Sequence, residues 1–165
     1  VEAVLLHPGA VEAFASYLQT YDTFVAEMRD MAEEAEARGV SIGIENVWNR
    51  FMLSPKEACD IVDAVDNPWV GIYLDTGNMM SYGYPEQWIR DLGPRIKAVH
   101  FKDFDRRQHR FVSLLEGDCP WPTVVQELRN VGYQGAVVHE VSGDRDQQID
   151  LAARMRKIMA SASET

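Results

Sequence analysis

The sequence predicts an α/β protein, because short apolar runs alternate with amphipathic helical patterns along its 165 residues. Five runs rich in Val, Ile or Leu each end on a polar residue, and they cover residues 3–7, 40–45, 70–75, 96–100 and 136–140. Continuous apolar strands are typical of a parallel sheet covered on both faces. Strict βα alternation indicates one such sheet, either open and doubly wound or closed as a barrel. No Gly/Ser-rich linker divides the sequence, so we expect residues 1–165 to form a single domain.

The segments between these runs predict five helices. Over about residues 20–38, helical spacing places apolar side chains on one face, with Gly39 as C-cap. That face holds Phe24, Met28, Met31, Ala32 and Ala35. Residues 54–57 (SPKE) form a capping box that starts the second helix, and Pro85 and Pro122 start two more. The last helix, over about residues 145–160, is expected to bury Leu151, Met155, Ile158 and Met159.

The composition excludes some classes of partner. The formal net charge of −10 repels a nucleic-acid backbone. No stretch approaches the ~20 apolar residues that span a bilayer, and the opening residues do not resemble a secretory leader, so we expect none. We therefore expect a cytoplasmic protein that binds neither nucleic acid nor membrane. Because the sequence opens with Val1 and runs directly into apolar residues, we also expect a processed, trimmed or partial chain.

Four residues able to bind a metal fall at the ends of predicted strands. Glu45, Asp75, His100 and Glu140 each end one apolar run. The carboxyl ends of parallel barrel strands converge on one mouth. Three carboxylates meeting there repel each other unless a divalent cation joins them. One such residue alone is ordinarily a cap or a salt-bridge partner, but four together favour a metal site. Their mixed oxygen and nitrogen ligands favour Mn²⁺, Co²⁺, Zn²⁺ or Mg²⁺.

Five segments resemble the xylose-isomerase-like sugar phosphate isomerase/epimerase superfamily. They are IENVWNRFMLSP (44–55), YLDTGN (73–78), GYPEQWI (83–89), VHFKD (99–103) and LEGD (115–118). The resemblance runs from about residue 3 to 142 and looks closest to ketose 3-epimerases of the tagatose/psicose and xylulose-phosphate type. It implies a (βα)8 TIM barrel, of which this chain covers about the last five βα units.

The resemblance also implies a mechanism and a ligand set. Glu45, Asp75, His100 and Glu140 hold one divalent metal in this interpretation, with Mn²⁺ preferred and Co²⁺, Zn²⁺ or Mg²⁺ as alternatives. Glu45 and Glu140 double as the acid/base pair of a sugar or sugar-phosphate isomerase. One glutamate removes a carbon-bound proton from the ketose, and the other returns a proton to the opposite face. The metal stabilises the enediolate between these steps.

Four further residues are expected to contact the substrate. Arg106 matches a family arginine near the metal, although a solvated loop charge remains the alternative. Lys102 directly follows the metal-ligand strand and is equally a surface lysine. Trp48 is the best candidate for a wall against which a sugar stacks. Asn78 stands where tagatose-type enzymes have a histidine; it donates a hydrogen bond but does not titrate. These enzymes also have a glutamate where residues 50–52 are RFM, so the sugar stays open.

Several alternatives share this fold. Apurinic endonucleases have a similar HPG segment, here at residues 7–9, but need a histidine at position 78. We interpret His7 as a turn residue or at most a neighbour of the ligands. Inosose dehydratases and hydroxypyruvate isomerases use a similar metal site and remain alternatives.

A non-enzymatic alternative is an incomplete barrel that binds metal or sugar without turnover. A full barrel needs ~250 residues, so the first three strands are expected to lie before Val1. An open half-barrel exposes two sheet edges and invites pairing. Family members often dimerise, which leaves a homo-oligomer open.

Overall fold

The computed structural model describes residues 2–162, and in that range five parallel strands form one sheet in the order β1-β2-β3-β4-β7. They are β1 (Ala3–Leu6), β2 (Ser41–Glu45), β3 (Val70–Asp75), β4 (Ile96–Phe101) and β7 (Val137–His139). Each strand of a βα unit pairs with the strand of the next unit, so every crossover turns the same way. This order defines barrel-type winding, because a doubly wound sheet requires the strand order to reverse.

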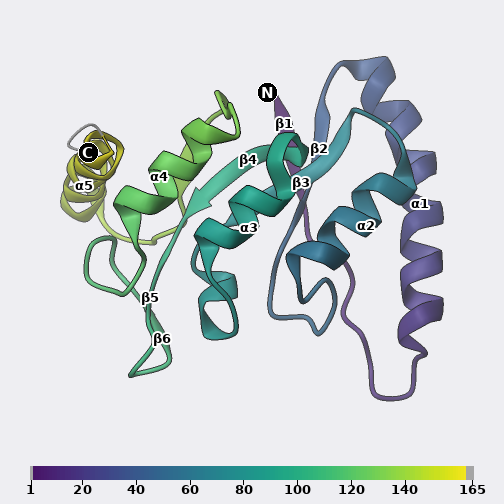
Figure 1. Cartoon of the computed structure of the whole chain (residues 1–165), viewed down its shortest axis with the longest axis horizontal. Coiled ribbons are helices and arrows are strands. Elements are labelled where there is room, and N and C mark those ends of the chain that lie inside the picture. The colour runs from purple at the N-terminus through teal and green to yellow at the C-terminus, as the bar shows by residue number, and fades with distance from the viewer. Residues whose placement is uncertain (1, 163–165) are drawn as a thin grey trace.

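Five α-helices in this range follow the strands: α1 (Tyr17–Arg38), α2 (Pro55–Val65), α3 (Pro85–Leu92), α4 (Trp121–Asn130) and α5 (Arg145–Ser161). Two short 3-10 turns, η1 (Asn78–Ser81) and η2 (Gly93–Arg95), flank α3. Each α-helix packs against the next one along the chain, from α1 to α5, and Figure 1 shows this succession along the sheet. Across residues 2–162, no helix combines the length and apolar character that a membrane span requires.

The hydrophobic core lies between the sheet and the helices. Ile44, Ile72 and Val99 are fully buried there. The expected buried faces of α1 and α5 need correction at one methionine each, because Met31 and Met159 are exposed. In α1 the buried stripe is Val25, Met28, Ala32 and Ala35, and in α5 the buried residues are Leu151 and Ile158. Met31 directly precedes the buried Ala32, and Met159 directly follows the buried Ile158. Neighbouring residues of an α-helix point about 100° apart around its axis, so each methionine turns away from the core.

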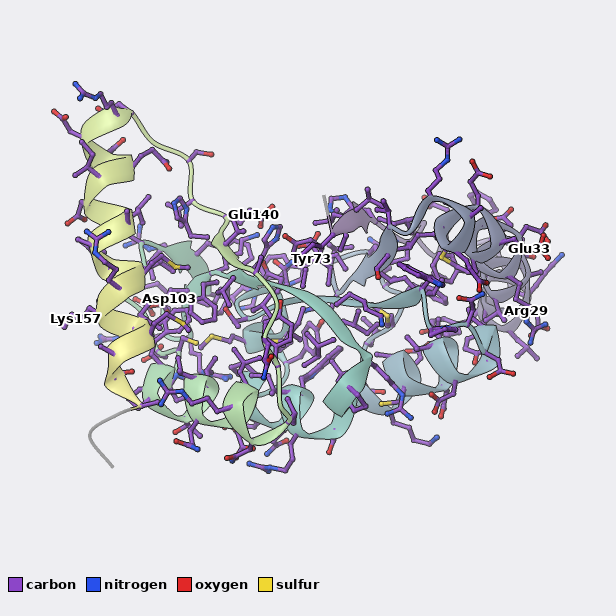
Figure 2. The ribbon with its side chains drawn as sticks, turned by 90° about the horizontal axis from the view of Figure 1, so that it is seen from above. Arg29, Glu33, Tyr73, Asp103, Glu140 and Lys157 are labelled. Carbon is purple, nitrogen blue, oxygen red and sulfur yellow. The ribbon has the colours of Figure 1, made fainter. Side chains whose placement is uncertain are left out.

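The other face of the sheet is open within residues 2–162, so the expected cover on both faces is absent there. Alternation along the strands points Leu5, Val138 and the candidate ligand residues to this face. Leu5 is 38% exposed and Val138 is 47% exposed. Figure 2 shows Tyr73 and Glu140 close together on this side, between α5 and the N-terminal part of the chain, with α2, α3 and α4 beneath the sheet. The sheet is thus a curled half-barrel whose concave face is accessible.

An antiparallel hairpin that the sequence did not predict follows β4. It consists of β5 (Asp103–Asp105) and β6 (Arg110–Val112). The fully buried carboxylate of Asp103 organises the segment that follows. It accepts hydrogen bonds from Phe104 N, Gly117 N, Cys119 N and Trp121 Nε1, at 2.9–3.2 Å. Asp103 is therefore a structural residue that joins the hairpin to the start of α4.

Candidate metal centre

The four candidate ligands meet at the carboxyl edge of the sheet. Glu45 ends β2, Asp75 ends β3, His100 is the penultimate residue of β4, and Glu140 directly follows β7. Each residue offers one ligand atom, and these four atoms all lie within 4.8 Å of one another. The cluster is compact enough for one cation to contact all four side chains. The strand order explains this arrangement, because β2, β3, β4 and β7 are successive neighbours.

Asp75 supplies the strongest sign that this cluster suits a cation. Its Oδ1 accepts hydrogen bonds from Gly77 N at 2.9 Å and from Asn78 N at 2.6 Å. Its Oδ2 is buried and has no hydrogen-bond partner. Burial raises the pKa of Asp75 to about 7, although the Lys102 charge and the Asn78 N–H oppose the shift. A divalent ion would satisfy the unpartnered oxygen and favour the charged carboxylate, so these residues fit a metal.

Glu45 is held between two histidines. Its Oε1 lies 3.1 Å from His100 Nδ1, and its Oε2 lies 2.5 Å from His7 Nε2. Of the two interpretations of His7, the structure supports a neighbour of the ligands. The Tyr73 ring packs 4.3 Å from the His100 ring, measured between centroids. Burial and then the charges of Glu45 and Glu140 raise the pKa of Tyr73.

Sequence analysis missed Tyr73, although its position was informative. It lies two residues before Asp75 in β3, and strand alternation places both side chains on the same face. Gly43 in the neighbouring strand makes room for this ring, because a Cβ there would lie 2.9 Å from Tyr73 Cβ. The tyrosine therefore belongs to the concave face that carries the ligands.

Lys102 extends into the same cluster. Its Nζ lies 2.6 Å from Glu140 Oε2, 3.2 Å from Asn78 Oδ1 and 3.9 Å from Asp75 Oδ2. Partial burial of Glu140 disfavours its charged form, but the hydrogen bond and the charge of Lys102 outweigh burial and lower the pKa of Glu140. The Glu140 carboxylate is therefore ionised at neutral pH.

Two buried polar residues lock the strand ends together, and sequence analysis singled out neither. Asn46 donates to Asp75 O and accepts from Asp75 N, both at 2.9 Å, which joins β2 to β3. Thr76 Oγ1 donates to Lys102 O at 2.9 Å and accepts from Lys102 N at 3.0 Å, which joins β3 to the end of β4. Both residues directly follow a ligand in the sequence. These hydrogen bonds fix the spacing of the candidate ligands Glu45, Asp75 and His100.

Of the other predicted substrate contacts, Asn78 and Trp48 lie beside the cluster of candidate ligands, whereas Arg106 lies apart from it. Asn78 is buried, donates from Nδ2 to Asn46 O at 2.9 Å and meets Lys102. Trp48 is 50% exposed and donates from Nε1 to Asn78 O at 2.6 Å. Arg106 lies apart: its guanidinium donates to Met80 O and Gly83 O, at 2.6 and 2.7 Å. The structure thus gathers Asn78, Lys102 and Trp48 around the ligands, while Arg106 holds the segment before α3.

A half-barrel parallel sheet with three carboxylates and an imidazole at its carboxyl edge belongs to the class of parallel barrels, whose sites lie at the carboxyl ends of the strands. Comparison with known families gives the particular class. A family described as xylose isomerase-like TIM barrel matches residues 1–161. The chain belongs to this family, and its fold is the one that the sequence resemblance implied.

Relatives of this chain include enzymes that act on sugars. The uncharacterized protein MJ1311 of Methanocaldococcus jannaschii is 29% identical over 153 residues, which are 88% of this chain and 52% of the relative. A D-psicose 3-epimerase of Enterocloster bolteae is 33% identical over 120 residues, which are 70% of this chain and 38% of the enzyme. The chain therefore spans between 38% and 52% of the length of these relatives.

A solved structure shows the same fold over nearly the whole chain. The crystal structure of a D-tagatose 3-epimerase-like protein superposes with a TM-score of 0.84 and 24% sequence identity. The match covers 99% of this chain and 64% of that protein. This likeness establishes the barrel-type fold for the part of the barrel that the chain spans.

Proposed function

We propose that this chain carries the metal centre of a divalent-metal-dependent sugar or sugar-phosphate epimerase or isomerase, with ketose 3-epimerisation as its reaction. The proposal rests on the meeting of the four ligand atoms within 4.8 Å at the carboxyl edge of the sheet. The D-psicose 3-epimerase relative supports a ketose substrate. Mn²⁺ is the proposed metal, and Co²⁺, Zn²⁺ and Mg²⁺ suit the same ligand types.

Glu45 and Glu140 are the proposed acid/base pair. They project from the two outer strands of the four that carry ligands, so they can reach a bound ketose from different sides. One carboxylate removes the carbon-bound proton, and the other returns a proton to the opposite face. Lys102 lowers the pKa of Glu140, so the carboxylate is ionised and has a free oxygen lone pair for the proton. A divalent ion, when bound, acidifies the substrate proton and stabilises the enediolate.

Polar and aromatic groups beside the ligands are the proposed substrate contacts. Lys102 and Asn78 present an ammonium and an amide next to Glu140. Trp48 offers a half-exposed indole whose ring stacks on His109, with centroids 5.8 Å apart. Arg106 is the fourth proposed contact, and it must exchange its bonds to Met80 O and Gly83 O to reach a substrate.

The test combines metal analysis with a substrate screen. We expect near-stoichiometric metal in the reconstituted parent chain and loss of metal in His100→Ala. With Mn²⁺ or Co²⁺, the parent is expected to interconvert C3-epimeric ketoses and to exchange the C3 proton with deuterated solvent. Glu45→Gln and Glu140→Gln should each slow this exchange at least ~100-fold.

Three outcomes would change the proposal. A parent chain that stays metal-free after reconstitution overturns the metal centre. A chain that binds metal without turning over any ketose, inosose or hydroxypyruvate supports the non-enzymatic alternative instead. The open concave face of the described half-barrel is the observation that favours this second candidate. Turnover of an inosose or of hydroxypyruvate would assign one of the related activities.

A further inference from the structure

Lys102 occupies an unusual place for a lysine, because it lies inside a cluster proposed to bind a cation. Its side chain is only 17% exposed. Its ammonium pairs with Glu140 at 2.6 Å and approaches Asp75 Oδ2 at 3.9 Å. Two of the proposed metal ligands are therefore already neighbours of a fixed positive charge.

Contacts with neighbouring residues hold the Lys102 side chain in place, unlike that of a flexible lysine on the surface. The Thr76 hydroxyl hydrogen-bonds both the N–H and the carbonyl of Lys102. Gly77 leaves space for the lysine stem, since a Cβ there would lie 3.0 Å from Lys102 Cβ and Cγ. The ammonium also lies 4.3 Å from the centroid of the Phe111 ring. These contacts hold the charge beside the ligands.

We propose that Lys102 is a built-in counter-ion of the centre, which competes with the divalent cation for Glu140 and thereby sets the metal affinity. This inference rests on the proposed metal function. Without metal, the ammonium offsets the repulsion among Glu45, Asp75 and Glu140. With metal, the same positive charge repels the cation across a few ångströms, and its bond to Glu140 Oε2 must be shared or released. Asn78 Oδ1 and the Phe111 ring remain as partners for the displaced ammonium.

The test measures metal affinity directly, with Mn²⁺ alone as the probe. Lys102→Met keeps the length of the side chain and removes its charge, whereas Lys102→Arg keeps the charge. Lys56→Met is the matched control, because Lys56 Nζ pairs with Asp60 at 2.8 Å on the surface, away from the centre. Isothermal titration gives the dissociation constant of each variant, and thermal unfolding in chelator gives the stability of the metal-free form.

We expect Lys102→Met to bind Mn²⁺ at least about tenfold more tightly than the parent, since one neighbouring positive charge is gone. We expect its metal-free melting temperature to fall, because the carboxylates lose their counter-ion. Lys102→Arg and Lys56→Met should stay within about threefold of the parent affinity. Adding His100→Ala to Lys102→Met should abolish the gain, which assigns it to this centre.

Failure of this inference differs from failure of the proposed function. If the parent binds Mn²⁺ and Lys102→Met binds it equally or more weakly, the lysine is no competitor and the inference is wrong, while the metal centre stands. If neither the parent nor Lys102→Met binds Mn²⁺, the metal function and the inference both fall. If only Lys102→Met binds Mn²⁺, the lysine competes with the cation as proposed, but the unaltered chain holds no metal and its proposed function falls.

Discussion

At the scale of single residues, Asp75 combines full burial with a carboxylate oxygen that no group in the described structure satisfies. Its pKa of about 7 in the folded chain lies above its ordinary value of 3.8, so the folded state binds the proton more tightly than the unfolded state. The resulting stability is fully present below about pH 4 and is lost as the pH rises through about 7. Metal-free protein therefore carries an unfavourable charge at neutral pH.

We predict that the free energy of unfolding of the metal-free chain falls between about pH 4 and pH 7, and that Asp75→Asn removes most of this decrease. The asparagine cannot ionise, so the buried position no longer acquires a charge. Urea unfolding in the presence of chelator, at several pH values, measures both proteins. Equal pH slopes in the parent and in Asp75→Asn would show that another group carries the dependence.

Asp103 is also a buried carboxylate, but unlike Asp75 both of its oxygens accept hydrogen bonds. Two backbone N–H groups donate to its Oδ1, and Gly117 N and the Trp121 indole donate to its Oδ2. We predict that Asp103→Asn lowers the free energy of unfolding by about 1–3 kcal/mol, because an amide NH₂ then faces donors in place of one oxygen. Urea unfolding measures the loss. The exposed Asp60→Asn is the control, and a matching loss there would contradict this explanation.

At the scale of elements, β3 and β4 meet through an irregular register. Ile72 pairs with Ile96 but Tyr73 pairs with Ala98, so Lys97 is an extra residue in β4. Gly71 permits this approach, because a Cβ there would lie 2.3 Å from Arg95 O and 2.7 Å from Lys97 Cγ. The irregular pairing thus lies in the two strands that carry Asp75 and His100.

We predict that Gly71→Ala destabilises the chain by about 1–3 kcal/mol, because the added methyl group meets backbone that cannot move aside without shifting the strands. Gly9→Ala is the matched control, since a Cβ at Gly9 has no heavy atom within 4 Å. Chemical denaturation of both variants provides the measurement. A Gly71→Ala variant as stable as the control would mean that β3 and β4 separate more easily than their packing indicates.

The sequence predicted the five sheet strands to within one or two residues, because each apolar run stops at a polar residue or a turn. It could not predict β5 and β6, whose three-residue segments DFD and RFV are too short for a periodic pattern. The convergence of strand ends was enough to predict that Glu45, Asp75, His100 and Glu140 lie together. The contact between His7 and Glu45 depends on which residues stand opposite each other in β1 and β2, and one sequence does not specify that register.

At the scale of the whole molecule, the proposed ligands all belong to this chain although it spans between 38% and 52% of the length of the relatives compared. The four strands that carry them are hydrogen-bonded neighbours, and Asn46 and Thr76 tie the ends of β2, β3 and β4 together. The centre therefore depends on contacts inside the described sheet. Metal binding can be measured on this chain independently of turnover.

Binding of a cation at this centre should stabilise the whole fold, because the four ligands come from four strands and meet only when the sheet is formed. At a free Mn²⁺ concentration of about 100 times its dissociation constant, the gain is about 2.7 kcal/mol. For a chain of this size, that corresponds to a rise in melting temperature of about 5–10 °C. Thermal unfolding with Mn²⁺ and with chelator measures this difference. His100→Ala should lose the rise, whereas His109→Ala, which removes an exposed imidazole outside the ligand set, should keep it. A rise that persists in His100→Ala would mean that Mn²⁺ binds elsewhere on this acidic chain, and the four-residue centre would lose its main support.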